Sequence, residues 1–333
     1  MVTIAINGFG RIGRHVLKIA LTNKNVKVVA INDLTNTKTL AHLLKHDTAY
    51  GNYELPVSFD EKNLVVKGKK IPVFAEKDPS LLPWKKLKVD VVLECTGRFR
   101  DKESAGMHVK AGAKKVIISA PAKGSDVPTY VRGINCGKVG KEKSTVINNA
   151  SCTTNCIAPV MAVLNEKFGI EKAMMSTVHG YTSDQNLQDG PHKDLRRARA
   201  AAENIVPTST GAAKAVGEVI MTLQGTFDGV AFRVPVPTCS LSDMTVVLKK
   251  NVTKEEVNKA LVAASKTSRF EGILATTEEP LVSADFVGNT YSSIVDLALT
   301  NVVGGNLVKV VAWYDNETGY ANRLMEMAEL YSK

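Results

Sequence analysis

The chain has 333 residues, of which 44% are hydrophobic and 23% charged, and its formal net charge at pH 7 is +10. This composition is ordinary for a soluble globular protein, and no apolar run approaches the roughly 18 residues that a membrane-spanning helix requires. The length favours two domains over one, because single hydrophobic cores stop growing at about 250–300 residues.

The N-terminal stretch MVTIAINGFGRIG has no basic flank followed by an apolar segment and a small-residue cleavage site. We therefore expect no secretory signal and a cytoplasmic protein. The five cysteines are too few and too irregularly spaced for a disulfide scaffold, which fits a reducing compartment. Cys152 and Cys156 are spaced like a metal-binding pair, but no second Cys or His pair accompanies them, so we expect no metal site.

The positive charge by itself fits nucleic acid, an anionic membrane surface or small phosphorylated ligands. The basic residues are scattered in short clusters, without a long basic tail or an aromatic RNA-binding motif. We therefore expect no membrane association and no dedicated nucleic-acid binding.

In residues 1–150, short β-branched runs alternate with helical patterns. The expected strands and helices, in chain order, are a strand at 3–6, a helix near 11–22, and strands at 26–31 and 89–97, then a helix near 103–111 and a strand at 114–119. Apolar strands separated by helices indicate a parallel sheet covered on both faces. This half of the chain is predicted to be a doubly wound, Rossmann-type α/β domain.

From residue 151 the pattern changes, with a helical stretch at 152–168 followed by longer strand-like runs. These runs lie at 172–182, 229–237, 241–250 and 306–315. Consecutive strands without crossovers indicate antiparallel pairing, so we predict an α+β domain over 151–316 with a mostly antiparallel sheet. Apolar positions at helical spacing predict a closing helix over about 317–333. Its periodicity leaves its partner domain open, and our expectation is that it packs back onto the first domain.

The first strand runs into NGFGRIG, which places Gly8, Gly10 and Gly13 at the start of a helix. Such glycines allow a tight turn, close backbone approach to a pyrophosphate and close helix packing, while the helix N-terminus favours negative charge. Asp33 follows the second strand, 20 residues beyond Gly13, where an acid typically bonds the adenosine ribose. Because a carboxylate repels a 2′-phosphate, these residues predict NAD rather than NADP. The alternative is a plain glycine-rich turn with a surface aspartate.

The segment NNASCTTNC places Cys152 at the N-terminus of the helix predicted over 152–168. The partial positive charge there lowers a thiol pKa and favours the thiolate, so Cys152 is a candidate nucleophile. Cys156 lies one turn further along and is expected to be a small buried side chain. His179 ends a predicted strand, but a single histidine is most often a core or surface imidazole, and spacing assigns it no partner.

Six segments follow one another along the chain: NGFGRIGR, ASCTTNC, VHGYTSDQ, DLRRARAAAENIVPTSTGAAKA, RVPVPT and WYDNETGY. With these segments the chain resembles the glyceraldehyde-3-phosphate dehydrogenase family, and the resemblance covers essentially its whole length. It implies NAD-dependent, phosphorylating oxidation of D-glyceraldehyde 3-phosphate to 1,3-bisphosphoglycerate in glycolysis or gluconeogenesis, by a homotetramer.

The resemblance also implies roles for individual residues. Cys152 would form a thiohemiacetal and then a thioester, and His179 would hold the thiolate and take the hydroxyl proton as hydride leaves. Main-chain groups of Arg11 and Ile12 would hold the cofactor pyrophosphate. The other residues implied at the cofactor are Gly8, Gly10, Gly13, Asp33, Lys77, Ser119 and Asn316.

Two phosphate sites follow from the same resemblance. Thr182 and Arg233 would bind the phosphate of the substrate, since a forked guanidinium suits phosphate oxygens. The phosphate that attacks the thioester would be bound by Ser151, Thr153, Arg197, Thr210 and Gly211. At least one of the arginines in RRAR, residues 196–199, is expected to lie on a solvated face.

The chain departs from the family pattern at two places. Lys77 stands where many members have an arginine near the adenine, and residues 189–191 replace a Leu-Pro pair, so the preference for NAD rests more heavily on Asp33. Two alternatives stay open: an erythrose-4-phosphate dehydrogenase of the same family, and a secondary RNA-binding or surface-binding role. The TGAAK segment at 210–214 favours the glyceraldehyde enzyme over the first alternative.

Overall fold

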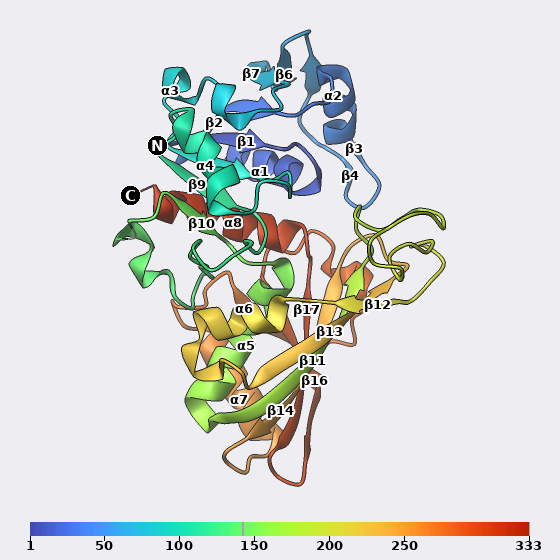
Figure 1. The fold of residues 1–333 in the computed structure, drawn as a ribbon. Coiled ribbons are helices and arrows are strands. Elements are labelled where there is room, and N and C mark those ends of the chain that lie inside the picture. The colour runs from blue at the N-terminus through green and yellow to red at the C-terminus, as the bar shows by residue number, and fades with distance from the viewer. Residues whose placement is uncertain (142, 333) are drawn as a thin grey trace. The chain divides into compact units, whose positions relative to one another are not determined.

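A computed structural model describes residues 1–141 and 143–332. The chain forms two compact units (Figure 1). Unit 1 comprises Met1–Tyr130, Cys136–Ala150 and Ala321–Lys333, and unit 2 comprises Val131–Asn135 and Ser151–Tyr320.

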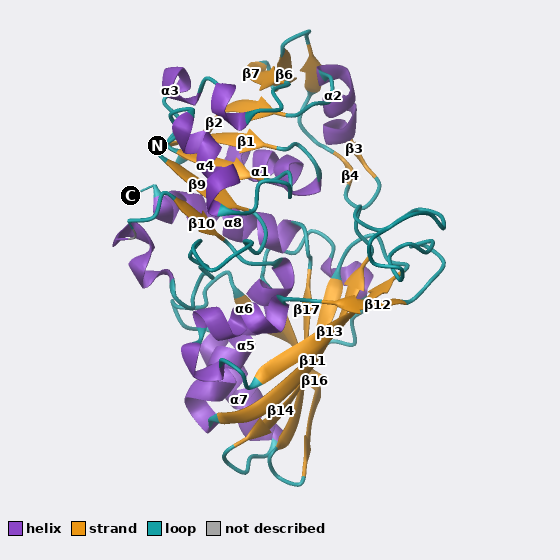
Figure 2. Cartoon of the chain, in the orientation of Figure 1, coloured by secondary structure: helices purple, strands orange, loops and turns teal. Residues whose placement is uncertain are grey.

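Unit 1 is built on an eight-stranded sheet in the order β10-β9-β8-β1-β2-β7-β6-β5 (Figure 2). The strands are β1 (Val2–Asn7), β2 (Val26–Asn32), β5 (Val57–Phe59), β6 (Asn63–Val66), β7 (Lys69–Phe74), β8 (Val91–Glu94), β9 (Lys115–Ile118) and β10 (Val146–Asn148). The pairs from β10 to β7 are parallel, whereas β5, β6 and β7 pair antiparallel at one edge. A separate hairpin joins β3 (His46–Asp47) and β4 (Gly51–Asn52).

The helices of unit 1 connect these strands. They are α1 (Arg11–Thr22), α2 (Thr37–Lys45), α3 (Trp84–Leu87) and α4 (Lys102–Lys110), with 3-10 helices η1 (Pro79–Leu81) and η2 (Cys136–Lys141). The central strand β8 is buried along its whole length, as expected of a parallel strand covered on both faces. The predicted Rossmann-type parallel sheet is thus confirmed.

Unit 2 is built on a seven-stranded sheet in the order β12-β13-β11-β14-β17-β16-β15. Its strands are β11 (Ile170–Gly180), β12 (Val206–Ser209), β13 (Phe227–Val234), β14 (Ser240–Leu248), β15 (Leu274–Thr277), β16 (Ser293–Val303) and β17 (Leu307–Tyr314). Its helices are α5 (Cys152–Phe168), α6 (Ala212–Val219) and α7 (Lys254–Ser265), with 3-10 helices η3 (Met221–Leu223) and η4 (Ser283–Phe286).

The predicted mostly antiparallel sheet is confirmed, with two exceptions: β11 pairs parallel with β13, and β15 pairs parallel with β16. The first exception arises because α6 lies between β11 and β13 in the chain, and parallel neighbours need such a crossover. The helix predicted over 152–168 has the predicted bounds as α5.

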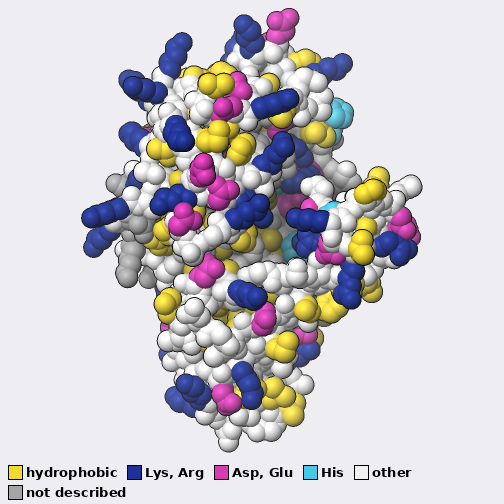
Figure 3. Space-filling view, viewed as in Figure 1, with side chains coloured by type: hydrophobic (Ala, Val, Ile, Leu, Met, Phe, Trp, Pro, Cys, Tyr) yellow, Lys and Arg dark blue, Asp and Glu magenta, His cyan; other side chains and the backbone are white. Residues whose placement is uncertain are grey.

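The last helix, α8 (Thr318–Tyr331), ends among residues of unit 1. Asn23 Nδ2 donates to Glu329 at 2.5 Å, and Lys115 Nζ lies 4.5 Å from the centre of the Tyr331 ring. No helix in the described part of the chain is both long and apolar enough to cross a membrane. On the face drawn in Figure 3, lysines and arginines are spread among acidic side chains.

Candidate active site

The backbone around Cys152 is held in a tight turn before α5. Ala150 is fully buried and has a φ of 53°, a left-handed conformation that costs a residue with a Cβ about 1–2 kcal/mol. The side chain of Asn148 holds this turn by accepting the Ala150 N–H at 3.0 Å. Ser151 then caps the helix by accepting the Thr154 N–H at 3.0 Å. Cys152 is therefore the first residue of α5, where the helix dipole is positive.

His179 faces this cysteine from near the end of β11, with Nε2 3.5 Å from Sγ of Cys152. Its other ring nitrogen, Nδ1, lies 2.6 Å from the carbonyl oxygen of Gly180. A carbonyl only accepts, so we assign the hydrogen of the neutral ring to Nδ1. The lone pair of Nε2 then points at Cys152, as a general base requires.

Arg233 occupies the adjacent strand β13, directly opposite His179 in the register. Its Nη1 lies 3.0 Å from Nδ1 of His179 and donates to the Gly180 carbonyl at 3.2 Å and to Thr182 Oγ1 at 3.1 Å. Because Nδ1 already carries hydrogen, the guanidinium acts on the imidazole as a charge. This places Arg233 and Thr182, the two residues implied for one phosphate, beside the candidate base.

Burial is the strongest influence on the two reacting groups. It lowers the pKa of His179 to about 3, and the Arg233 charge acts in the same direction. Burial also raises the pKa of Cys152, against the opposing effects of Arg233 and of hydrogen bonds from Thr153. Burial therefore outweighs the lowering effect expected at a helix N-terminus, and the pKa of the Cys152 thiol lies above its ordinary value.

Two other thiols, those of Cys95 and Cys156, differ from Cys152 in their surroundings. Burial raises the pKa of Cys95 to about 12, with a contribution from the Glu94 carboxylate. Burial likewise raises the pKa of Cys156 to about 12, and its Sγ lies 3.8 Å from Ser293 Oγ. The prediction that Cys156 is a small buried side chain is confirmed.

Tyr314 was not predicted as a site residue, although it lies in the WYDNETGY segment. Its hydroxyl bonds Thr153 Oγ1 at 2.8 Å and Thr177 Oγ1 at 2.9 Å, and its ring is edge-on to His179 at 6.0 Å between centroids. Burial raises the pKa of Tyr314, which keeps the phenol neutral. Tyr314 thus fastens the first turn of α5 to β11, and the Thr153 hydroxyl implied for phosphate already has a partner.

Asn316 is connected to the same strand end through a short chain of hydrogen bonds. The Gly180 N–H donates to Ser240 Oγ at 3.1 Å, and Ser240 donates to Asn316 Oδ1 at 3.0 Å. Asn316 is only 6% exposed. Asn316, which is implied at the nicotinamide end of the cofactor, is therefore connected through Ser240 to the strand that carries His179.

Asp184, a second residue that the sequence did not single out, joins the two implied phosphate sites. Its carboxylate accepts a hydrogen bond from Thr182 Oγ1 and another from Arg197 Nη1. Burial raises the pKa of Asp184, but the bonds from Thr182 and the charges of Arg197 and Arg233 outweigh it, so that this pKa lies below its ordinary value. The carboxylate thus accepts from two donors that also suit phosphate.

Arg197 is the one arginine of RRAR that is turned inward, with Nε donating to Thr208 Oγ1 at 2.9 Å. Arg196 and Arg199 are exposed, as expected of a solvated face, and Arg199 pairs with Asp189 at 2.7 Å. Thr210 and Gly211 lie at the start of α6. Gly211 is the N-cap residue and, as a glycine, has no side chain that could cap the first turn. Thr154 of α5 donates to the Ala212 carbonyl at 3.4 Å, so the N-termini of α5 and α6 lie side by side.

Four residues predicted for the dinucleotide lie at the carboxyl edge of the unit 1 sheet, namely Gly8, Gly10, Gly13 and Asp33, whereas Asn316 belongs to unit 2. Gly8 has a φ of +92°, and a Cβ on Gly13 would lie 2.1 Å from the Gly8 oxygen, whereas a Cβ on Gly10 would meet nothing within 4 Å. Asp33 Oδ2 accepts the Phe9 N–H at 2.8 Å, which ties the loop to the end of β2. The tight turn and the open space at Gly10 fit a bound pyrophosphate.

The remaining residues implied for NAD lie in the same unit. Arg11 and Ile12 form the first turn of α1, and the Arg11 side chain pairs with Asp47 at 2.5 Å. Lys77 is exposed beyond the end of β7, and Ser119 directly follows β9, with its N–H bonded to the Glu94 carbonyl at 3.0 Å.

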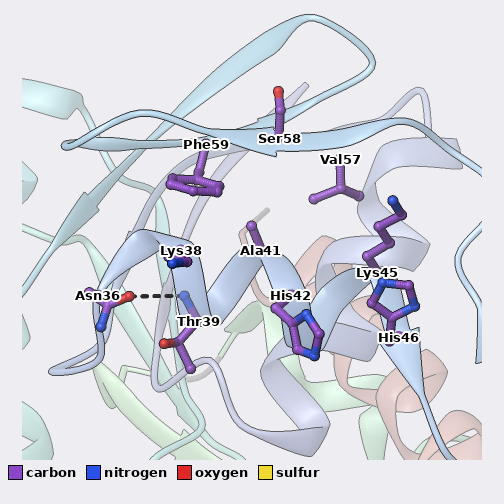
Figure 4. Close-up of a pocket in the computed structure, with 10 residues that line it drawn as sticks. All are labelled: Asn36, Lys38, Thr39, Ala41, His42, Lys45, His46, Val57, Ser58 and Phe59. Atoms are coloured by element: carbon purple, nitrogen blue, oxygen red, sulfur yellow. Dashed lines mark hydrogen bonds between the residues drawn. The ribbon is translucent and has the colours of Figure 1, made fainter.

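A hollow of about 700 Å³ lies elsewhere in unit 1, between α2 and β5. Figure 4 shows His42 and His46 along its lower side and Phe59 above them. The residues that line it include none of those predicted for the cofactor. It is therefore separate from the dinucleotide edge.

Two family models match the chain: the glyceraldehyde 3-phosphate dehydrogenase NAD binding domain over residues 2–102 and the C-terminal domain of the same family over 151–316. The chain is 56% identical over 327 residues to the glyceraldehyde-3-phosphate dehydrogenase of Geobacillus stearothermophilus, covering 98% of this chain and 97% of that protein. It is 56% identical over 335 residues to that of Thermotoga maritima, covering both chains completely. It is 54% identical over 332 residues to glyceraldehyde-3-phosphate dehydrogenase 1 of Bacillus subtilis, covering 100% of this chain and 98% of that protein.

Proposed function

Since the chain belongs to the glyceraldehyde-3-phosphate dehydrogenase family, we propose that it catalyses the NAD-dependent, phosphorylating oxidation of D-glyceraldehyde 3-phosphate to 1,3-bisphosphoglycerate in the cytoplasm, in glycolysis or gluconeogenesis. The observation that carries this proposal is the pairing of Cys152 Sγ with the unprotonated Nε2 of His179 at 3.5 Å. A nucleophile within reach of an oriented base is the arrangement that covalent catalysis requires.

The residues present supply each proton and bond change of the reaction. Sγ of Cys152 attacks the aldehyde carbon, so that a C–S bond forms and the carbonyl π bond breaks. The thiol proton passes through His179 Nε2 to the carbonyl oxygen, which becomes the hydroxyl of a thiohemiacetal and leaves His179 neutral. His179 Nε2 takes the hydroxyl proton while the carbon loses its hydride, which leaves a thioester. Inorganic phosphate then attacks the thioester carbon, the C–S bond breaks, and Cys152 leaves as thiolate. NAD, when bound, supplies the hydride acceptor.

Two groups of donors suit the two phosphates. Arg233 and Thr182 lie within 3.1 Å of each other beside His179, and we assign them to the phosphate of the substrate. We assign the attacking phosphate to Ser151, Thr153, Arg197, Thr210 and Gly211, where the N-termini of α5 and α6 add favourable dipoles. Asp184, bonded to both Thr182 and Arg197, has to yield its donors when phosphate binds.

We assign NAD to the loop of Gly8, Gly10 and Gly13 with the first turn of α1, and its adenosine ribose to Asp33. Residues 2–102 match the NAD binding domain of the family. A 2′-phosphate would meet the Asp33 carboxylate, so the residues favour NAD over NADP. Lys77, Ser119 and Asn316 complete the proposed cofactor contacts.

We also propose that the enzyme is a homotetramer, as the family resemblance implies, because one face of the unit 2 sheet exposes apolar side chains among its polar ones. The strand registers place Met174, Val230, Val303 and Leu307 on the same face. Met174 is 64% exposed and Val303 59% exposed. Exposed apolar side chains that gather on one face commonly mark subunit contacts. Sedimentation analysis should give a tetramer for the wild type and smaller species for Met174→Glu.

The reaction is tested by following NADH absorbance with glyceraldehyde 3-phosphate and NAD. We expect rapid NADH formation that depends on added phosphate or arsenate and is abolished in Cys152→Ser. Activity with erythrose 4-phosphate but little with the triose would point to the sister enzyme of the family. Failure to turn over either aldehyde, with salt-sensitive RNA binding instead, would overturn the proposal.

A further inference from the structure

A row of buried polar groups follows the carboxyl edge of the parallel sheet in unit 1, and the proposed reaction uses none of them as a reacting group. The row consists, in order, of the backbone of Glu76, then the side chains of Asn32, Asn7, Glu94, His108 and Trp84. Asn7, Glu94 and His108 are each at most 1% exposed. Such buried polar groups persist only where their hydrogen bonds are satisfied.

The hydrogen-bond direction on one side of the row is fixed by the backbone. The Glu76 N–H donates to Asn32 Oδ1 at 2.9 Å, which leaves Asn32 Nδ2 to donate to Asn7 Oδ1 at 2.7 Å. Asn7 Oδ1 is therefore an acceptor, and its amino group Nδ2 points to Glu94 Oε2 at 2.5 Å. Because a backbone N–H only donates, neither amide can be turned round without losing a bond.

The direction on the other side is fixed by an indole. Trp84 Nε1–H donates to His108 Nδ1 at 2.9 Å, so the hydrogen of a neutral His108 lies on Nε2, 3.2 Å from Glu94 Oε2. Thr96 donates to Glu94 Oε1 with its N–H, at 2.8 Å, and with its hydroxyl. Four hydrogen-bond partners therefore converge on Glu94, two at each carboxylate oxygen.

Three members of the row directly precede a residue assigned to NAD, among them Glu76, which precedes Lys77. Asn7 directly precedes Gly8, and Asn32 directly precedes Asp33. A Cβ on Gly8 would lie 2.7 Å from the Thr96 backbone nitrogen, so this loop packs against the one that follows Glu94. We propose that Glu94 is a positioning residue for NAD: its carboxylate ties together the loops that follow β1, β2, β7 and β8 and holds Gly8 and Asp33 in place. This inference rests on the proposed function.

The test replaces the carboxylate by an amide of the same shape, Glu94→Gln. The new amino group has to face donors whose directions are fixed, so the loops shift and hydrogen bonds are lost. We expect the Kd for NAD, measured by calorimetric titration, to rise about tenfold, with an equal rise in the KM for NAD. We expect kcat at saturating NAD to stay within about twofold of the wild type, because Cys152 and His179 belong to unit 2.

The matched control is Glu61→Gln, which removes the same charge from an exposed position between β5 and β6 and should leave the Kd unchanged. If Glu94→Gln does not fold, the double variant Trp84→Phe/His108→Leu removes one arm of the row, and Glu94 Oε2 keeps its hydrogen bond from Asn7. We expect it to fold, by circular dichroism, and to bind NAD about threefold more weakly.

The positioning role would be overturned if the variant that folds melts at a lower temperature than the wild type but binds NAD within twofold of it. Glu94 would then serve stability alone. A wild type that binds no NAD would instead overturn the proposed function, and this inference with it. The two failures are therefore distinguishable in one set of titrations.

Discussion

The guanidinium of Arg233 lies 3.0 Å from Nδ1 of His179, on the opposite side of the imidazole from the nitrogen that faces Cys152. This charge opposes protonation of His179 and favours the thiolate of Cys152. An anion bound to Arg233 offsets the charge. The phosphate of the substrate would therefore make His179 a better base at the moment when the proton has to be taken.

The first prediction concerns this charge. Arg233→Leu removes the charge that lowers the pKa of Cys152, so the thiol should ionise at higher pH. Alkylation of the Cys152 peptide by iodoacetamide at pH 7, followed by mass spectrometry, should be slower than in the wild type, because a smaller fraction of the thiol is ionised. Arg199→Leu, at an exposed arginine, is the matched control and should leave the rate unchanged. An unshifted pH profile in Arg233→Leu would contradict the assignment.

The second prediction separates the two phosphate groups. Arg197→Leu should raise the KM for inorganic phosphate about tenfold or more, because a charge-assisted hydrogen bond is lost. The KM for glyceraldehyde 3-phosphate should change much less, since Arg233 and Thr182 remain. Steady-state kinetics with each substrate varied in turn measures both constants, with Arg199→Leu again as the control. Equal rises in both KM values would mean that Arg197 does not distinguish the two phosphates.

Local patterns predicted much of the fold. The bounds of α5 were predicted in full, because Ser151 caps its start and Gly169, with a φ of 72°, follows its end. The parallel pairing of β11 with β13 was not predicted, since it depends on where α6 crosses. Helices α2, α6 and α7 and strand β16 were also not identified from the sequence.

The candidate site was less accessible to sequence reasoning. Cys152 and His179 are 27 residues apart and meet only because α5 begins at the end of the sheet where β11 finishes. Their pairing came from family resemblance, as no spacing rule predicts it. Asp184, Tyr314 and Glu94 were missed because each acts through hydrogen bonds to residues distant in the chain, or to partners whose orientation sequence does not encode.

The third prediction is a pH dependence of stability. Asp47 has a side chain only 3% exposed and accepts from Arg11 at 2.5 and 3.2 Å. Burial raises the pKa of Asp47, but Arg11 and the N–H groups of Ala49 and Tyr50 outweigh it and hold the pKa below the ordinary 3.8. A carboxyl whose folded pKa is depressed stabilises the fold above its unfolded pKa, and this stabilisation disappears as the pH falls through the folded pKa.

Asp47→Asn should therefore lower the free energy of unfolding by about 1 kcal/mol at pH 7, measured by urea unfolding. The difference from the wild type should shrink once the pH falls below 3.8. Glu61→Gln, which removes an exposed charge, should show no such pattern. If the free energy of unfolding of Asp47→Asn is lower than that of the wild type by the same amount at every pH, the loss comes from altered packing rather than from the lost charge.

The last prediction separates a glycine that the fold needs from one that the cofactor needs. A Cβ on Gly13 would lie 2.1 Å from the Gly8 oxygen, so Gly13→Ala should cost about 1–3 kcal/mol of stability and lower the melting temperature by several degrees in the absence of NAD. Gly10 has a negative φ of −73°, and a Cβ there would meet nothing within 4 Å. Gly10→Ala should therefore melt like the wild type.

For NAD binding we expect the opposite ranking, with Gly10→Ala affected more than Gly13→Ala. The open space at Gly10 is where the backbone is expected to approach the pyrophosphate, so Gly10→Ala should weaken NAD about tenfold or more although its fold is intact. Melting curves without NAD and calorimetric titration with it measure the two effects separately. A Cβ on Gly10 would meet no protein atom within 4 Å, so the methyl group could collide only with the bound cofactor. Tight NAD binding by Gly10→Ala would therefore mean that the pyrophosphate does not approach this loop.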